Sequence, residues 1–155
     1  MIAVLQRVLS ASVTADGQPS GSCGKGFLIL LGVLRGDGAE DARLLADKIS
    51  RLRVFSDEAG KMNLALSDVG GGVLIVSNFT LGANYAHGNR PDFFGSAPPD
   101  EAVPLYEEFI RLMRERVGRV ETGVFGADMQ ISMEADGPVT IVMDSEKLKK
   151  GKKAQ

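Results

Sequence analysis

A chain of 155 residues has the length of one domain and can bury a core without disulfides or metal ions. Its 44% hydrophobic and 25% charged residues are ordinary for a globular protein. Its one cysteine, Cys23, and one histidine, His87, exclude an internal disulfide and a His/Cys zinc cluster. No apolar stretch reaches the roughly 18 residues of a membrane span, and no signal-peptide pattern opens the chain, so we expect a cytoplasmic protein without membrane contact.

The charge is unevenly distributed along the chain. Residues 144–155 hold five lysines and two acidic residues, so the remaining chain has 13 basic and 18 acidic side chains. An acidic body argues against a protein that coats long stretches of nucleic acid, and any contact with RNA should be local. We expect one folded domain over residues 1–145 and a Lys-rich tail without ordered structure over 146–155, with unspecific attraction of phosphates as the alternative role of the lysines.

The first half of the chain predicts strands followed by a helix. Two strands are expected at 2–8 and about 11–15, in an antiparallel start with a turn at 16–17. A buried strand over 26–33 follows. After the break at 36–38, a helix is predicted from apolar residues at helical spacing: Ala42, Leu45, Ile49 and Leu52. Short strands are expected at 53–55 and 62–66.

The second half is built around the β-branched run 72–76, which predicts a strand buried on both faces. The stretch 82–99 has little periodicity, and loops of that length are usually functional or disordered. A second helix is predicted over 99–117, with Pro104 near its start. The last two strands are expected at 126–133 and 138–143. Together these elements predict an α+β fold with two main helices.

Two short segments at strand edges are the candidates for chemistry. Ser77-Asn78-Phe79-Thr80 follows the central strand, and Asp136-Gly137-Pro138-Val139-Thr140 precedes the last one. Strand ends on a rigid scaffold commonly hold catalytic and binding residues. Taken alone, Asp-Gly-Pro indicates only a turn. A hydrolase with a Ser-His-Asp set would need His87, and we expect replacement of His87 by Ala to leave activity intact.

These segments resemble the two motifs of D-aminoacyl-tRNA deacylases, Ser-Gln-x-Thr and Gly-Pro. The likeness continues in the same order over residues 1–143, notably at 1–8, 55–64, 88–91 and 122–130. It implies a strongly curved, mostly antiparallel, barrel-like sheet with two main helices packed on it, in a homodimer. It also implies hydrolysis of the ester between a D-amino acid and the tRNA 3′ end, with no metal or organic cofactor, and glycyl-tRNA is not excluded as a substrate.

The resemblance assigns the catalytic role to the first segment, Ser77 to Thr80. Main-chain N–H groups at Phe79 and Thr80 are implied to face the scissile carbonyl, and the 2′-hydroxyl of the terminal adenosine takes part in its own deacylation. An aminoacyl ester is already activated, so positioning and oxyanion stabilisation are sufficient. Asn78 replaces the family Gln and is shorter by about 1.5 Å. We therefore expect the side-chain part of the motif to differ more than its backbone part.

The second segment is implied to select the chirality of the substrate. Gly137 and Pro138 would form a cis pair that reaches the partner subunit's site and rejects L-amino acids by steric exclusion. Arg7 is implied to brace this pair.

The long loop supplies further candidates for substrate binding. Arg90, Pro91, Phe93 and Phe94 would contact the terminal nucleotides, with loop anchoring as the alternative. Met129 is interpreted as core or pocket lining.

Two other interpretations stay open. A deacylase of the same fold with relaxed chirality would follow from a trans Gly137-Pro138 bond. A non-catalytic tRNA-binding dimer, in which Asn78 marks decay of the site, would bind tRNA without turnover.

Overall fold

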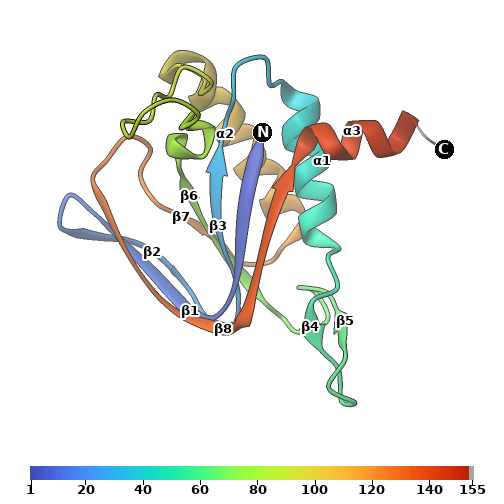
Figure 1. Cartoon of the computed structure of the whole chain (residues 1–155). Coiled ribbons are helices and arrows are strands. Elements are labelled where there is room, and N and C mark those ends of the chain that lie inside the picture. The colour runs from blue at the N-terminus through green and yellow to red at the C-terminus, as the bar shows by residue number, and fades with distance from the viewer. Residues whose placement is uncertain (154–155) are drawn as a thin grey trace.

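A six-stranded mixed sheet forms the frame of the molecule (Figure 1). The structure is a computed structural model that describes residues 1–153. The sheet has the order β2-β1-β3-β6-β7, and β8 pairs with the other edge of β1. Its strands are β1 (Ile2–Ala15), β2 (Gln18–Cys23), β3 (Gly26–Gly32), β6 (Gly72–Ser77), β7 (Val120–Thr122) and β8 (Met129–Asp144). The remaining elements are α1 (Ala39–Ser50), α2 (Pro99–Arg116), α3 (Ser145–Lys153), the 3₁₀ turn η1 (Phe79–Gly82) and the separate pair β4 (Phe55–Ser56) and β5 (Met62–Leu64).

β1 and β8 are long strands that run antiparallel along almost their whole length. Their pairing extends from Ile2 opposite Asp144 to Ala15 opposite Met129, with register shifts between Gln6 and Ser10. The sequence predicted two separate strands in each of these regions, and that prediction was wrong. The two predicted breaks, one in β1 and one in β8, are register irregularities that lie opposite each other inside continuous strands. Such bulges bend a pair of strands without ending their pairing.

The bend makes the sheet nearly closed. The bend brings residues 11–15 of β1, together with β2, close to β7. The Ser20 hydroxyl of β2 donates a hydrogen bond to the Thr122 carbonyl of β7 at 3.0 Å. The predicted α+β class and barrel-like curvature are therefore confirmed. The sheet is mixed, because β3–β6 and β6–β7 are parallel while the three pairs of β1 are antiparallel.

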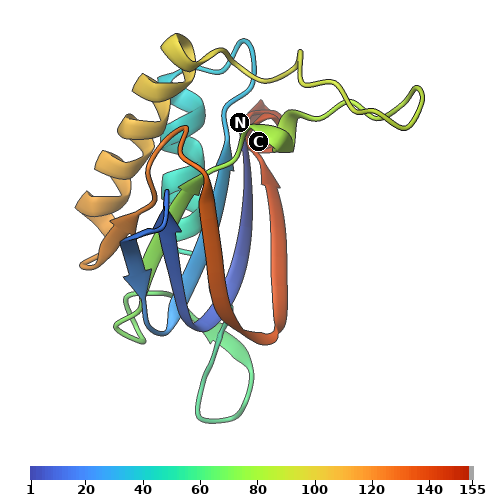
Figure 2. The same cartoon turned by 90° about the vertical axis from the view of Figure 1, so that its left-hand side faces the viewer.

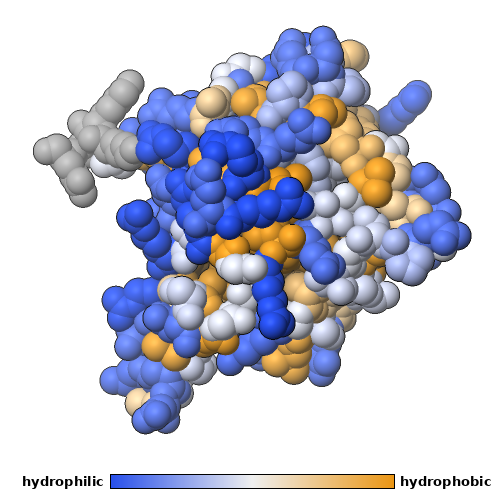
Figure 3. Space-filling view, turned by 180° about the vertical axis from the view of Figure 1, so that it is seen from behind, coloured by the Kyte–Doolittle hydropathy of each residue, from blue (hydrophilic) through white to orange (hydrophobic). Residues whose placement is uncertain are grey.

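α1 and α2 cover one face of the sheet and leave the other without a helix (Figure 2). Alternate residues of β3 separate the two faces, because Ile29 and Leu31 join the core beneath the helices while Leu30 faces the opposite way. Seen from behind, hydrophilic side chains cover much of the helical face, with apolar surface between them (Figure 3).

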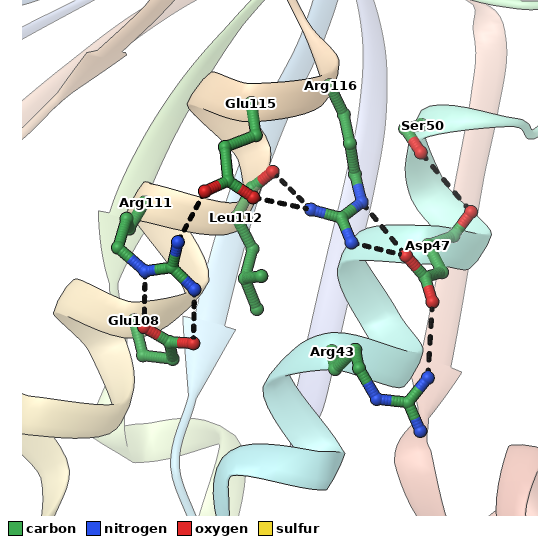
Figure 4. Close-up of polar contacts among 8 residues, drawn as sticks. All are labelled: Arg43, Asp47, Ser50, Glu108, Arg111, Leu112, Glu115 and Arg116. Carbon is green, nitrogen blue, oxygen red and sulfur yellow. Dashed lines mark hydrogen bonds and ion pairs between the residues drawn. The ribbon is translucent and has the colours of Figure 1, made fainter.

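An ion-pair network joins the two helices on their outer side (Figure 4). Arg116 near the end of α2 contacts Asp47 of α1 at 2.6 Å and donates to the Leu112 carbonyl at 2.7 Å. This network fixes the crossing of the helices at the end where α2 finishes.

α3 is anchored by a buried polar cluster at the start of α1. The Ser145 hydroxyl donates to Asp41 at 2.6 Å, and Lys149 lies 2.7 Å from the same carboxylate. The N-terminal ammonium of Met1 donates to Ser145 at 2.8 Å and to Asp37 at 2.6 Å. Composition predicted a tail without ordered structure from residue 146, whereas the chain is helical to Lys153; residues 154 and 155 lie outside the described residues.

The length and hydropathy of the helices bear on membrane contact. Within residues 1–153, none is both long and apolar enough to cross a bilayer.

Candidate active site

The candidate site lies at the sheet edge where the parallel strands β3 and β6 both end. The N–H of Asn78 donates to the Leu31 carbonyl at 2.8 Å, which extends the pairing of the two strands by one residue. Gly32 allows the close approach of η1, because a Cβ there would lie 2.9 Å from Leu81 Cβ and 3.0 Å from the Asn78 carbonyl oxygen. The end of β3 therefore fixes the position of the Ser77 to Thr80 segment.

Asn78 caps the turn that follows it. Its Oδ1 accepts hydrogen bonds from the Thr80 N–H at 3.2 Å and from the Thr80 hydroxyl at 2.5 Å. A side-chain acceptor at this position is the usual way to satisfy the first N–H groups of a helical turn. The shorter Asn side chain therefore acts on its own turn, and in this arrangement it occupies the Thr80 donor.

The main-chain N–H of Phe79 is the donor that remains available. Within residues 1–153 it has no hydrogen-bond acceptor. The Phe79 carbonyl accepts a hydrogen bond from the Ser96 hydroxyl at 2.6 Å. The Phe79 ring packs edge-on against the Phe93 ring, with 5.1 Å between the ring centroids. The segment that contains Phe93 and Ser96 thus holds the turn in place, and the Phe79 N–H stays free for a ligand.

A cavity of about 870 Å³ adjoins this turn. That volume is within the usual range for small-molecule sites. Its walls come from the ends of β3 and β6, the start of α2 and the segment between β7 and β8. The lining includes Leu30, Arg35, Val76, Ser77, Asn78, Phe79, Thr80, Phe93, Ser96, Ala102, Tyr106, Phe125, Asp128, Met129 and Ile131.

Tyr106 is a buried residue of the cavity wall with a polar group. Its hydroxyl donates to the Ile75 carbonyl at 3.2 Å, and burial raises the pKa of Tyr106 to about 12. The phenol therefore stays protonated near neutral pH and is a positioning group rather than a base. Sequence reasoning missed Tyr106, although it is adjacent to Leu105 in the apolar stripe of the predicted helix.

The candidates of the long loop lie in different places. Phe93 and Met129 line the cavity, while Arg90 and Pro91 are exposed and do not. His87 is also exposed and does not line the cavity. Among the described residues, no group of three or more His, Cys, Asp or Glu side chains is arranged to bind a metal ion.

Gly137 and Pro138 lie at the bend of β8, away from the cavity of their own chain. The bond between them is cis, the isomer that the resemblance implies. Gly137 has φ +125°, and a Cβ there would lie 2.7 Å from the Val139 nitrogen, so this position favours glycine. The structure therefore does not bring this pair together with Ser77 to Thr80 within one chain.

Arg7 is buried beneath the bend of β8. Its Nε lies 3.0 Å from Asp136 Oδ2, although the N–H does not form a hydrogen bond with it, and its Nη1 donates to the Val54 carbonyl at 2.6 Å. The arginine therefore ties the residue before Gly137 to the segment that precedes β4.

Comparisons with known proteins agree with this architecture. The model of the family described as D-Tyr-tRNA(Tyr) deacylase matches residues 4–144. A D-aminoacyl-tRNA deacylase of Anaeromyxobacter dehalogenans is 57% identical over 96% of this chain and 99% of its own length. One of Thermus aquaticus is 53% identical over 94% of this chain and 95% of its own length.

Solved structures show the same fold. A c-Myc DNA unwinding element binding protein superposes with a TM-score of 0.87 at 39% identity, over 93% of this chain and 98% of its own. A probable eukaryotic D-amino acid tRNA deacylase superposes with a TM-score of 0.80 at 17% identity, over 92% and 98%, and this likeness concerns the fold alone. On the full-length match and the high identity to its relatives, the chain belongs to the D-aminoacyl-tRNA deacylase family of hydrolases.

Proposed function

We propose that this chain hydrolyses the ester bond of D-aminoacyl-tRNA in the cytoplasm and releases free D-amino acid and tRNA. The main support is the unpaired N–H of Phe79 at the edge of a cavity of about 870 Å³. A cavity of this size accommodates a terminal adenosine with its amino acid. A preorganised main-chain donor beside it suits a reaction in which a carbonyl oxygen becomes negatively charged.

The reaction needs positioning more than acid–base machinery. A water molecule attacks the ester carbonyl, its oxygen bonds to the carbonyl carbon, and the bond from that carbon to the ribose 3′ oxygen breaks. The Phe79 N–H stabilises the oxyanion, and the Thr80 N–H joins it when the Asn78 amide turns away. The 2′-hydroxyl of the substrate assists the proton transfer from the water to the departing 3′ oxygen.

A homodimer completes the site in this proposal. The helix-free face of the sheet carries an apolar row across four strands, in which Val4 lies opposite both Val142 and Leu30, and Leu30 lies beside Val76. Val142 is 65% exposed, a large value for an apolar strand residue. Leu30 and Val76 also line the cavity, so a second copy on this face would form part of the cavity wall.

The two-fold arrangement explains how the separate motifs would meet. In a two-fold dimer formed through the helix-free faces, the bend of β8 in one subunit would lie over the ends of β3 and β6 in the other subunit. Gly137 and Pro138 of one subunit then approach the Phe79 turn of its partner. Their backbone excludes an L side chain, whereas a D side chain points away from it and glycine has none to exclude.

Comparing three esters tests the activity. D-tyrosyl-, L-tyrosyl- and glycyl-tRNA are incubated with the purified protein and a metal chelator, and ester loss is followed over time. We expect rapid loss of the D ester while the L ester is spared. Loss of both esters at similar rates supports the alternative of relaxed chirality, and tRNA binding without loss of any ester supports a non-catalytic dimer.

A further inference from the structure

An arm formed by residues 83–95 projects from the active-site edge of the sheet. Figure 2 shows this segment extending well beyond the sheet on the side opposite the helices. Its base adjoins the cavity, because Phe93 within the arm and Phe79 shortly before it both line the cavity. Anything bound along the arm is therefore adjacent to a substrate in the cavity.

The arm is internally bonded and is not a loose loop. The N–H groups of Asn84 and Asp92 donate to each other's carbonyls at 2.8 and 2.9 Å, and the Asn84 amide donates to the Asp92 carboxylate at 3.0 Å. Arg35 fixes the part of the arm that returns to the sheet. Its side-chain Nε donates to the Phe94 carbonyl at 2.7 Å, and its main-chain N–H donates to the Gly95 carbonyl at 2.9 Å. The side chains on the arm are thus presented on an ordered backbone.

The exposed aromatic side chains of the described chain gather on this arm and at its base. Tyr85 is 80% exposed, Phe94 is 79% exposed and Phe79 is 59% exposed. Within residues 1–153, no other aromatic side chain is on the surface to this degree. Exposure of large aromatic rings in a chain with only 6% aromatic residues indicates a binding surface.

The charge of the arm matches an anionic, ring-bearing ligand. Asp92 is the one acidic residue between positions 81 and 98, and its carboxylate is engaged by Asn84. Arg90 is exposed near the tip, and Arg35 is exposed at the base. Aromatic rings interleaved with arginines are the combination that binds single-stranded nucleic acid, by stacking on bases and attraction of phosphates.

We propose that Tyr85 and Phe94 form a stacking platform for the unpaired nucleotides that precede the terminal adenosine of the tRNA. This inference rests on the proposed function, which places the terminal adenosine in the cavity. The arm then binds the single strand as it leaves the cavity, and Arg90 contacts its phosphates. The platform increases affinity for the whole tRNA without taking part in the hydrolysis.

A second copy of the chain is the other candidate occupant of the arm. The arm lies on the side of the uncovered sheet face, where the proposed dimer forms. Its tip is polar, however, with His87, Asn89 and Arg90 between Tyr85 and Pro91. The buried centre of a protein interface is more apolar than its rim, whereas His87 and Asn89 are polar and exposed, so this tip favours RNA.

Two substrates separate the platform from the catalytic centre. Kinetics are measured for Tyr85→Ala and Phe94→Ala with D-tyrosyl-tRNA and with D-tyrosyl-adenosine, which lacks the preceding nucleotides. We expect KM for the tRNA to rise about 5- to 150-fold per variant, the range of one lost stacking contact, with kcat unchanged. Hydrolysis of D-tyrosyl-adenosine stays at the wild-type rate. Tyr85→Phe keeps the ring and should have the KM of the wild type. Met62→Ala, which truncates an exposed apolar residue of β5, is the matched control.

Three outcomes of the kinetic and sedimentation measurements overturn the platform. An unchanged KM for the tRNA does so, and so does an equal loss on both substrates. A change of molecular mass in sedimentation assigns the arm to a second copy instead.

If the wild-type protein hydrolyses neither ester, the proposed function fails, and the platform is tested by binding deacylated tRNA with and without its last three nucleotides. Tighter binding of the complete tRNA, lost in Tyr85→Ala, then supports the platform, and equal binding of both overturns it.

Discussion

At position 79 the backbone and the side chain have separable roles. Phe79 is the first residue of η1, where proline is tolerated. Asn78 before it is extended, with φ −145° and ψ 91°, and so lies outside the α region that a following proline disfavours. Phe79→Pro therefore removes the candidate oxyanion donor without opposing the fold. Phe79→Ala keeps the N–H and removes only the ring.

We expect Phe79→Pro to lower kcat for D-tyrosyl-tRNA by about 100- to 1,000-fold, the usual cost of one lost oxyanion donor. Phe79→Ala should retain much more of kcat, because the donor remains. Single-turnover kinetics measure the chemical step in both variants, with Tm as the control for folding. Equal losses in the two variants would assign the role to the ring and not to the backbone.

Asn78 presents a different question, because its amide oxygen sits beside the same donors. Asn78→Asp keeps a capping acceptor of the same shape, and Asn78→Ser keeps a neutral one, so both should preserve Tm. A carboxylate next to the developing oxyanion repels it, and we expect Asn78→Asp to lower kcat at least about tenfold relative to Asn78→Ser. Similar kcat values in the two variants would place Asn78 too far from the reacting carbonyl to matter.

Among the elements, α3 makes two polar contacts to one carboxylate of α1, that of Asp41. Burial alone would raise the pKa of Asp41, but hydrogen bonds from Lys149 and Ser145 outweigh it and hold the pKa below its ordinary value of 3.8. A carboxyl whose pKa is lowered on folding stabilises the protein above its unfolded pKa, and this contribution is lost as the pH falls through the folded value.

Asp41→Asn should therefore destabilise the protein by about 2 kcal/mol at pH 7, the scale of a hydrogen bond to a charged group. The difference in Tm from the wild type should shrink as the pH falls below about 4, because Asp41 becomes protonated and loses its ion pair. Thermal unfolding across this range measures it. Glu40→Gln, in the same turn but exposed, is the control, and a pH-independent difference for Asp41→Asn would contradict the ion-pair account.

The elements also show how far sequence reasoning reached. The strand at 72–76 and the helix at 99–116 were predictable, because each has a continuous apolar run or stripe of its own. The continuity of β8 was not, since its pairing depends on β1, more than 100 residues away. The helical course after Ser145 was missed for the same reason, because the contacts that anchor it come from Met1 and Asp41.

The same division applies to the candidate site. Ser77 to Thr80 could be located from the end of a predicted strand, and a family resemblance supplied their expected roles. The capping of Thr80 by Asn78 and the contribution of Tyr106 to the wall depend on how the turn and α2 meet. No periodicity or motif in one sequence reports such contacts between elements.

For the whole molecule, the uncovered sheet face predicts dependence on a second copy. Val142→Glu places a charge in the apolar row that crosses the helix-free face. A partner subunit on this face would have to bury that charge without a counter-charge. We expect this variant to sediment as a monomer and to lose hydrolysis of D-tyrosyl-tRNA while keeping its far-UV circular dichroism. Met62→Glu, on the β4–β5 pair, should change neither property. An active monomer would contradict a site shared between subunits.

The long pairing of β1 with β8 also orders events during synthesis of the chain. β1 is translated more than 100 residues before β8, so one of its edges stays unpaired until residues 129–144 have been made. Contacts between such distant segments slow folding, and an open strand edge invites association with other nascent chains. A protein that removes misacylated tRNA thus becomes competent only after residues 129–144 have been translated, and nascent chains stalled before residue 129 should be bound by chaperones rather than be active.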